Sequence, residues 1–197
     1  GRIANGDINR AKKLMLMAKD CGADYVKFQK RDIETVYSKE FLDSPRQSPW
    51  GTTQREQKMG LEFGTTEYNA INLWSKEIGI PWFAAAYDMV SLAFINQYQT
   101  PLHKIASPMI TNLPFVTEVA ELGKLTLIST GMCELIDIMN AKRTFEELEC
   151  PHVLMHCVSE YPCPDEACNL AFIPKLKKTF GCEVGYSNHS PGLVSCI

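Results

Sequence analysis

The segment Leu125-Thr126-Leu127-Ile128-Ser129-Thr130-Gly131 is a short apolar run that ends in small polar residues. Four other runs have the same form, at residues 24–29, 103–107, 153–159 and 184–189, and residues 80–86 form a further apolar run. A stretch with helical spacing follows most of them. This alternation is typical of a parallel sheet whose strands are buried on both faces and joined by crossover helices. We therefore expect an α/β fold with six strands in β/α order.

Two architectures fit this order. A closed eight-stranded barrel typically needs about 250 residues, so a chain of 197 residues would hold about six of its eight β/α units and lack a first strand and a last unit. An open doubly wound sheet would prefer a glycine-rich phosphate loop after the first strand. Lys27-Phe28-Gln29-Lys30-Arg31 is not such a loop. We favour an incomplete TIM-type (β/α)8 barrel over residues 1–197, with the open sheet as the alternative.

A long polar insertion interrupts the β/α order at about residues 30–65. Insertions of this length in a compact domain are usually lids or binding loops. We expect the same role here, because the insertion directly follows the first predicted strand.

The bulk composition narrows the class of protein. A net charge of -3 argues against nucleic-acid binding, because such surfaces are usually basic. The chain has no run of 18 or more apolar residues, so no membrane span is expected. The first residues lack the apolar segment of a signal peptide. The eight cysteines form no CxxC pair, which indicates free thiols in a reducing cytoplasm rather than a zinc site. A catalytic Cys157 or Cys163 is the weaker alternative.

Polar side chains follow the predicted strands at their carboxyl ends, which line the active site in folds of this kind. We expect these side chains to converge on one cavity: Lys27, Gln29, Lys104, Ser107, Ser129, Ser159, Ser187 and His189. Two lysines and several hydroxyls around one cavity suit an anionic substrate, most simply a phosphorylated one.

Seven short motifs span nearly the whole chain in this order: Asn5-Gly6-Asp7, Val26-Lys27-Phe28-Gln29, Lys104-Ile105-Ala106-Ser107, Ile128-Ser129-Thr130-Gly131-Met132, His156-Cys157-Val158-Ser159-Glu160-Tyr161-Pro162, Asn169-Leu170 and Gly185-Tyr186-Ser187-Asn188-His189. Taken together, they resemble the N-acetylneuraminate (sialic acid) synthase family. The loop from Ser48 to Lys58 looks like one branch of that family. Each motif alone is weak, but seven in register are a specific signal.

The resemblance implies an enzyme that condenses phosphoenolpyruvate with N-acetylmannosamine or a related amino sugar. In the family, carbon 3 of phosphoenolpyruvate attacks the open-chain sugar aldehyde, water adds at carbon 2, and phosphate leaves by C–O cleavage. The products are a nine-carbon 2-keto sugar acid and phosphate. A divalent metal, Mn²⁺ or Mg²⁺, activates the aldehyde as a Lewis acid. The resemblance also implies a homodimer and a small antifreeze-like C-terminal domain, which these 197 residues do not include.

The resemblance assigns roles position by position. Lys27 and Lys104 resemble the lysines that hold the phosphoenolpyruvate carboxylate and phosphate. Gln29 and Tyr161 resemble contacts to the sugar, and His189 resembles one of two histidine ligands of the metal. The remaining positions resemble hydroxyl contacts to phosphoenolpyruvate: Ser107, Ser129, Ser159 and Ser187. Ser159 stands where several relatives have asparagine.

The chain also departs from the family pattern. The catalytic Glu of the first strand and the second metal-binding His of the eighth strand have no counterpart in this sequence. Met109 replaces an acidic residue, and Ala86 replaces a hydroxyl residue that often contacts the phosphate. We therefore expect the 197-residue chain alone to be a weakly active or inactive fragment that is marginally stable or self-associates.

Two other functions remain open from the sequence. A degenerate, non-catalytic barrel that binds a sugar or a partner is one, and Met109 and Ala86 favour it slightly. An unrelated phosphate-binding aldolase is the other, and it would require Lys27 or Lys104 to form a Schiff base. Neither the exact sugar nor the preferred metal follows from the motifs.

Overall fold

The computed structural model describes residues 4–196 of the chain. The chain divides into two compact units, residues 1–101 and residues 102–197. Six strands run parallel to their neighbours within these units, and each strand apart from the last precedes a helix or an insertion that leads to the next strand. The predicted β/α order is therefore confirmed. None of the helices in residues 4–196 is long and apolar enough to cross a membrane.

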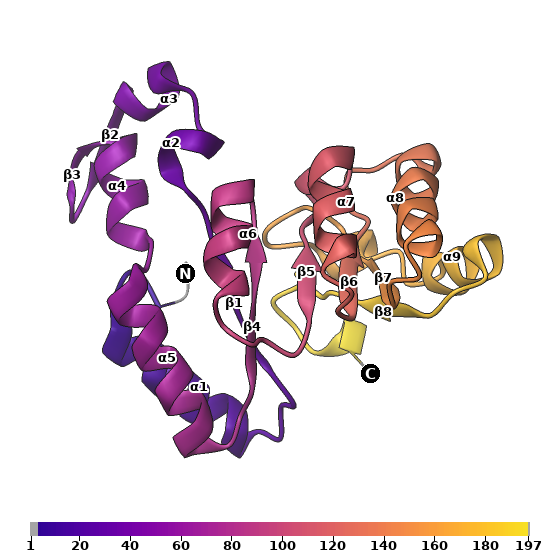
Figure 1. Ribbon diagram of the computed structural model, residues 1–197, viewed down its shortest axis with the longest axis horizontal. Helices are drawn as coiled ribbons and strands as arrows, with labels where there is room; N and C mark the ends of the chain where they lie inside the picture. The colour runs from indigo at the N-terminus through magenta and orange to yellow at the C-terminus, as the bar shows by residue number, and fades with distance from the viewer. Residues whose placement is uncertain (1–3, 197) are drawn as a thin grey trace. The chain divides into compact units, whose positions relative to one another are not determined.

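The first unit is built on two parallel strands, β1 (Val26–Lys30) and β4 (Trp82–Ala86). Helices α1 (Ile8–Asp20) and α5 (Thr65–Ile78) lie side by side next to this pair (Figure 1). Their apolar faces meet one face of the strands in a buried aromatic and aliphatic core that contains Met15, Tyr68, Ile71, Trp82 and Ala84. A third helix, α6 (Met89–Asn96), follows β4.

The ends of these helices follow ordinary capping chemistry. The Asp7 carboxylate caps α1 by accepting from the backbone N–H of Asn9 and Arg10. Helix α5 ends at Gly79, whose φ of 72° is the left-handed conformation that glycine adopts at low cost. At its start, Gly64 rather than a threonine is the N-cap residue, and the Glu67 carboxylate accepts from the Gly64 N–H at 2.8 Å.

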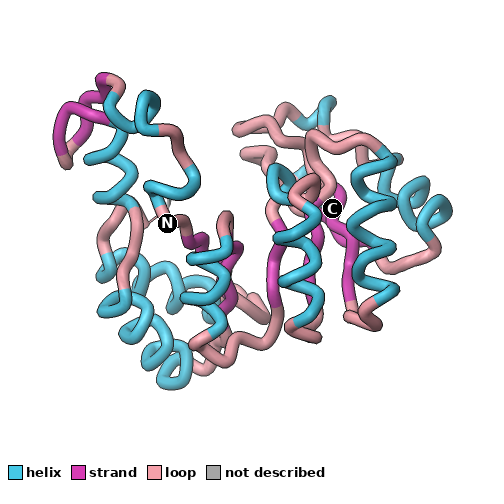
Figure 2. Tube along the Cα trace, turned by 45° about the horizontal axis from the view of Figure 1, so that its top comes forward, coloured by secondary structure: helices cyan, strands magenta, loops and turns pink. Residues whose placement is uncertain are grey.

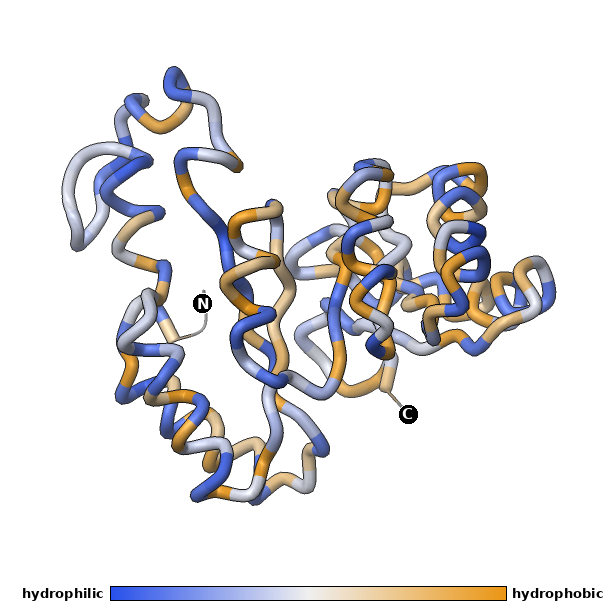
Figure 3. The backbone as a smooth tube through the Cα atoms, viewed as in Figure 1, coloured by the Kyte–Doolittle hydropathy of each residue, from blue (hydrophilic) through white to orange (hydrophobic). Residues whose placement is uncertain are grey.

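The predicted insertion is not an open loop. It folds into α2 (Ile33–Val36), α3 (Lys39–Asp43), the hairpin of β2 (Pro45–Ser48) and β3 (Gly51–Thr53), and α4 (Gln54–Leu61) (Figure 2). Figure 3 shows that hydrophilic positions predominate in it. Arg55 ties its elements together through ion pairs with Glu34 and Asp43. The insertion therefore consists of short helices and a hairpin, with side-chain ion pairs between its helices.

The second unit contains four parallel strands in the order β5 (His103–Ile105), β6 (Thr126–Ser129), β7 (His152–His156) and β8 (Val184–Tyr186). Helices α7 (Leu113–Glu121) and α8 (Leu135–Glu147) lie side by side, and α9 (Phe172–Phe180) precedes β8 (Figure 1). The Asn112 side-chain oxygen caps α7 by accepting from the Phe115 backbone N–H at 3.3 Å. Three 3-10 turns complete the unit: Ser107–Met109, Asp165–Ala167 and Val194–Cys196.

The four strands of the second unit end two to three residues earlier than the apolar runs predicted. Strand β7 ends at His156 and β8 at Tyr186. As a result, the small polar residues of these motifs, Ser159 and Ser187 among them, lie in the loops just past the carboxyl ends of the strands. This is where a parallel β/α fold places its chemistry.

Candidate active site

A buried lysine marks the carboxyl ends of β5 and β6. The Lys104 ammonium donates to the Ser129 hydroxyl, with 2.5 Å between Nζ and Oγ. Both residues are buried, with exposed fractions of 7% and 5%. A buried ammonium is costly unless polar groups meet it. Two of the eight side chains that were expected to converge therefore meet in the second unit.

A small polar cradle adjoins the ends of β5, β6 and β7. The Ser107 hydroxyl accepts from the Gly131 backbone N–H at 3.0 Å, and it lies 3.3 Å from the Cys157 sulfur. A Cβ on Gly131 would overlap the Ser159 hydroxyl and lie 3.0 Å from both Ser107 Oγ and Cys157 Sγ. Two hydroxyls and a thiol thus surround a position that only glycine can occupy without displacing them.

One thiol beside this cradle, that of Cys133, is held in its neutral form. Cys133 Sγ lies 3.0 Å from the Gly131 carbonyl oxygen and donates to it. Burial, with a contribution from Asp137, raises the pKa of Cys133 to about 12. A neutral thiol is a weak nucleophile, so nothing in this geometry activates Cys133. Cys157 serves as a neighbour of Ser107 rather than as part of an assembled nucleophile and base.

The end of β8 carries the predicted metal ligand. His189 Nδ1 lies 2.5 Å from the Val158 carbonyl oxygen, which can only accept, so Nδ1 carries the proton. The Tyr161 ring packs against the His189 ring at 4.1 Å between centroids, and the Cys163 N–H donates to the His189 carbonyl at 3.0 Å. The loop after β7 therefore fixes the His189 ring and leaves Nε2 as the nitrogen with a lone pair.

This arrangement fits a metal only in part. Metal-binding histidines usually donate their second ring N–H to a carbonyl or carboxylate, as His189 does. Among residues 4–196, however, no group of three or more histidine, cysteine or acidic side chains could hold an ion. The described part of the chain supplies one prepared imidazole and no complete ligand set.

Two other histidines are structural. His156 is buried, and its Nε2 lies 2.8 Å from the Cys168 carbonyl oxygen, as expected for a histidine that packs inside the fold. His103 is the first residue of β5, within the predicted run at residues 103–107, and it is only 2% exposed.

In the first unit, Lys27 and Gln29 point away from the helices. Side chains alternate between the faces of a strand, and Phe28 lies on the face that packs against α1 and α5. Lys27 and Gln29 therefore share the opposite face, as predicted. Lys27 is exposed, however, and not buried as expected. Among the described strands β1 pairs with β4 alone, so the residues flanking Lys27 are covered on one side only.

The alternation of side chains along β4 also shows which of its alanines shares a face with Gln29. Ala84 belongs to the buried core beside the helices, and Ala86 is in phase with it. Ala85 is the residue that pairs with Gln29 and shares its face. Ala85 rather than Ala86 therefore occupies the position at which a hydroxyl could reach a ligand on this face. Met109 lies in the 3-10 turn after Ser107 and is half-buried.

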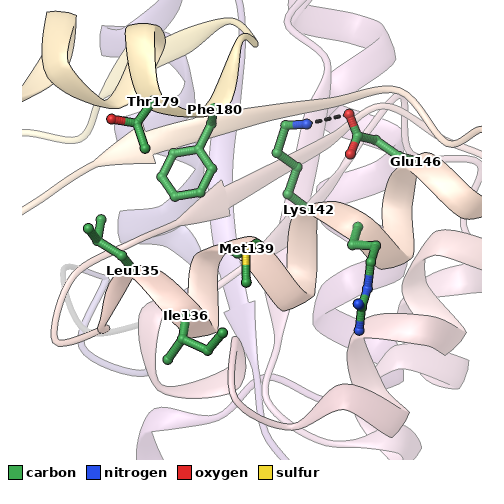
Figure 4. Close-up of a pocket in the computed structure, with 8 residues that line it drawn as sticks. Leu135, Ile136, Met139, Lys142, Glu146, Thr179 and Phe180 are labelled. Carbon is green, nitrogen blue, oxygen red and sulfur yellow. Dashed lines mark hydrogen bonds and ion pairs between the residues drawn. The ribbon is translucent and has the colours of Figure 1, made fainter.

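A hollow elsewhere in the second unit has a different character. A groove of about 470 Å³ lies between α8 and α9, lined by Leu135, Ile136, Met139, Lys142, Arg143, Glu146, Thr179 and Phe180 (Figure 4). Lys142 and Glu146 form an ion pair at its rim. Its floor is apolar, and it contains none of the predicted site residues. The groove is therefore distinct from the polar strand ends.

Sequence reasoning missed three parts of this geometry. Gly131 was recognised only as part of a motif, although its missing side chain makes room for Ser107 and Ser159. Arg31 and Tyr87, which contact the Gln29 amide, carried no role. A glycine directly after a polar strand end and a charged residue two positions past Gln29 were the available signals.

The chain matches a known protein family over most of its length. The NeuB family model matches residues 14–197. N-acetylneuraminate-9-phosphate synthase of Homo sapiens is 32% identical over all of this chain and 56% of its own length. N,N'-diacetyllegionaminic acid synthase of Campylobacter jejuni is 33% identical over 96% of this chain and 58% of its own length. The chain thus spans a little over half the length of these relatives.

A solved structure supports the fold. The N-acetylneuraminic acid synthetase of Leptospira borgpetersenii, crystallised with citrate, has a TM-score of 0.86 and 27% identity over 98% of this chain and 64% of its own. This likeness confirms the fold class, an incomplete (β/α)8 barrel of six β/α strands. The family match over nearly the whole chain, the two sugar-acid synthases among its relatives and this structural likeness lead to one identification: the chain belongs to the NeuB family.

Proposed function

We propose that the protein carrying this chain condenses phosphoenolpyruvate with N-acetylmannosamine or a related N-acetylated amino sugar to give a nine-carbon 2-keto sugar acid and phosphate. Its relatives are sugar-acid synthases with different products, sialic and legionaminic acids. The acceptor is therefore proposed as a class. We further propose that the enzyme is cytoplasmic and works as a homodimer, without nucleic-acid or membrane partners.

One observation carries this proposal: the buried Lys104–Ser129 pair beside the cradle of Ser107, Gly131 and Ser159. Phosphoenolpyruvate carries about three negative charges, and preorganised cations and donors stabilise both such a ligand and a departing phosphate. Lys104 is already desolvated and hydrogen-bonded, so binding needs little reorganisation of the protein. We assign Lys104, Ser107, Ser129, Ser159 and Ser187 to the phosphoenolpyruvate site.

The remaining proposed roles concern the second substrate and the metal. We assign Lys27 to the anionic substrate, and Gln29 and Tyr161 to the sugar. His189 would bind Mn²⁺ or Mg²⁺ through Nε2, together with ligands outside the described residues. When bound, the metal would polarise the aldehyde oxygen as a Lewis acid. Tyr161 and Val158 hold the His189 ring in place for this role.

Calorimetry with phosphoenolpyruvate tests the proposal on the full-length protein. Lys104→Ala should weaken binding by about tenfold or more, because it removes a charge-assisted contact. Lys178→Ala, which removes an exposed lysine of α9 in the same unit, is the matched control and should bind as the wild type does. Equal binding by Lys104→Ala and wild type would refute the assigned site. Borohydride trapping of Lys27 or Lys104 with a keto substrate would favour an aldolase instead.

A further inference from the structure

The side-chain amide of Gln29 is held from both sides in the first unit. Its Nε2 donates to the Tyr87 hydroxyl at 3.2 Å, and its Oε1 accepts from Arg31 Nη2 at 3.2 Å. A guanidinium has donors and no acceptor. The amide oxygen must therefore face Arg31 and the amide nitrogen must face Tyr87, so the amide has one orientation and not two.

Arg31 is itself fixed in three ways. Its guanidinium carbon lies 3.9 Å from the centroid of the Tyr87 ring, a cation–π contact that keeps the guanidinium next to that ring. Its backbone N–H donates to Glu62 Oε2 at 3.2 Å, and Nη1 lies 3.7 Å from Glu62 Oε1. The side chains of Arg31 and Glu62 are mostly buried, 20% and 15% exposed. Little solvent screening is therefore available at this contact.

Glu62 connects the insertion to the end of β1. It directly follows α4, the last helix of the insertion, and also lies 3.8 Å from Lys30 Nζ. Burial raises the pKa of the Glu62 carboxyl despite its two cationic neighbours. The mostly buried Glu62 carboxylate contacts both the guanidinium and the backbone N–H of Arg31. The folded insertion thus ends on the residue that sets the position of Arg31.

We propose that Arg31 is a positioning residue for acceptor recognition: it fixes the Gln29 amide so that one N–H and one carbonyl lone pair are presented to the polar groups of the amino sugar. An amide with two hydrogens and two lone pairs keeps one of each after its contacts to Tyr87 and Arg31. A fixed donor and acceptor discriminate between sugars better than a rotating amide, because the wrong isomer leaves a polar group unmatched. This inference rests on the proposed role of Gln29.

Steady-state kinetics of the full-length protein tests the functional part. Arg31→Met should raise KM for the amino sugar about tenfold and leave KM for phosphoenolpyruvate within about twofold. In a Gln29→Ala background the same substitution should add less than twofold, because it acts through Gln29. Arg31→Lys keeps the charge but not the planar fork and should restore only part of the loss. Arg46→Met, at an exposed arginine of β2, is the control and should match wild type.

Equal effects on both KM values, or a full tenfold effect of Arg31→Met in the Gln29→Ala background, would overturn the proposal. A structural readout separates this from failure of the synthase function. The Gln29 side-chain amide resonances, assigned by their loss in Gln29→Ala, should shift to positions typical of a solvated amide in Arg31→Met and stay unchanged in Arg46→Met. That shift in a protein without synthase activity would refute the proposed function and keep the positioning role. No shift would refute the positioning role itself.

Discussion

Lys104 and His103 are adjacent buried basic residues whose side chains lie in different environments. As successive residues of β5 they point to opposite faces. The Lys104 ammonium meets the Ser129 hydroxyl. The Nε2 atom of His103 is buried without a hydrogen-bond partner among residues 4–196. Burial, with a smaller contribution from Lys124, lowers the pKa of His103 from 6.5 to about 4. His103 is therefore neutral in the folded protein.

This difference predicts an acid-sensitive fold. Below pH 6.5 the unfolded chain binds a proton on His103 that the folded chain does not bind, so stability falls as the pH drops from about 6.5 to 4. By pH 5 the loss is about 2 kcal/mol, and below pH 4 this residue adds no further loss. Urea unfolding at several pH values should show a flatter acid limb for His103→Gln than for wild type. Parallel curves for the two proteins would contradict the assignment.

The thiols give a second prediction at this scale. Cys21 and Cys196 are exposed, whereas Cys163 and Cys168 are buried, with their sulfurs 3.8 Å apart. Burial, with a contribution from Cys168, raises the pKa of the Cys163 thiol. Reaction requires an accessible thiolate, so iodoacetamide should label Cys21 and Cys196 first.

Peptide mapping by mass spectrometry checks this order, with labelling in denaturant as the control for total thiol. The pair Cys163 and Cys168 should stay unlabelled until the protein unfolds. Rapid native labelling of either residue would show that the loop after β7 is open.

The strand-end rule predicted which polar residues lie at the strand ends, but not all of their environments. Lys104, Ser129, Ser107 and Ser159 could be named because the carboxyl ends of parallel strands are recognisable from short apolar runs. The exposure of Lys27 and the burial of His103 could not. They depend on which strands cover β1 and on what packs over the start of β5, and neither is encoded in the local pattern. The Arg31 contact to Gln29 was likewise hidden, because it depends on a side chain that turns back toward its own strand.

At the scale of elements, the insertion departs most from its sequence reading. The sequence predicted only a polar insertion, of the kind that serves as a lid or binding loop, and named no element within it; short helices and a hairpin form there. Capping explains this: the Thr53 hydroxyl and the Glu56 carboxylate form a capping box at the start of α4. Such boxes stabilise a helix that buries little apolar surface. Helix boundaries elsewhere could be predicted closely, because Asp7, Asn112 and the glycines at helix ends are strong signals.

Gly60 is the packing point of this insertion. A Cβ on Gly60 would overlap the first atoms of the Trp50 indole, and a Cβ on Gly6 would overlap the Gly60 carbonyl. Alanine in a helix normally gains about 1 kcal/mol over glycine. Here the Trp50 ring must move away, so Gly60→Ala should destabilise the protein by about 1–3 kcal/mol, as overpacking does.

Urea unfolding followed by tryptophan fluorescence measures this change. Met59→Ala, at an exposed neighbour on the same helix, is the control and should shift the midpoint little. A Gly60→Ala protein more stable than wild type would show that Trp50 does not pack against α4 as described.

At the scale of the whole molecule, the chain covers 56–58% of the length of the sugar-acid synthases it resembles. Among the described strands, β1 pairs only with β4 and β8 only with β7. Each therefore has one side whose backbone N–H and C=O groups lack a strand partner within residues 4–196. Such edges are templates for pairing with another chain. The sequence predicted these edges because it placed only six strands in a fold that closes with eight.

We therefore expect the 197-residue chain, purified alone, to self-associate with rising concentration, and the full-length protein to form one defined oligomer. Light scattering after size exclusion measures both. The apolar groove on α8 and α9 offers a rival cause, because Leu135 and Met139 are about half exposed. Met139→Glu places a charge in that groove and should leave the association of the isolated chain unchanged if strand edges cause it. A monodisperse monomer with a sharp, high melting transition would refute the prediction. Loss of association in Met139→Glu would show that the groove on α8 and α9, and not the strand edges, causes the association.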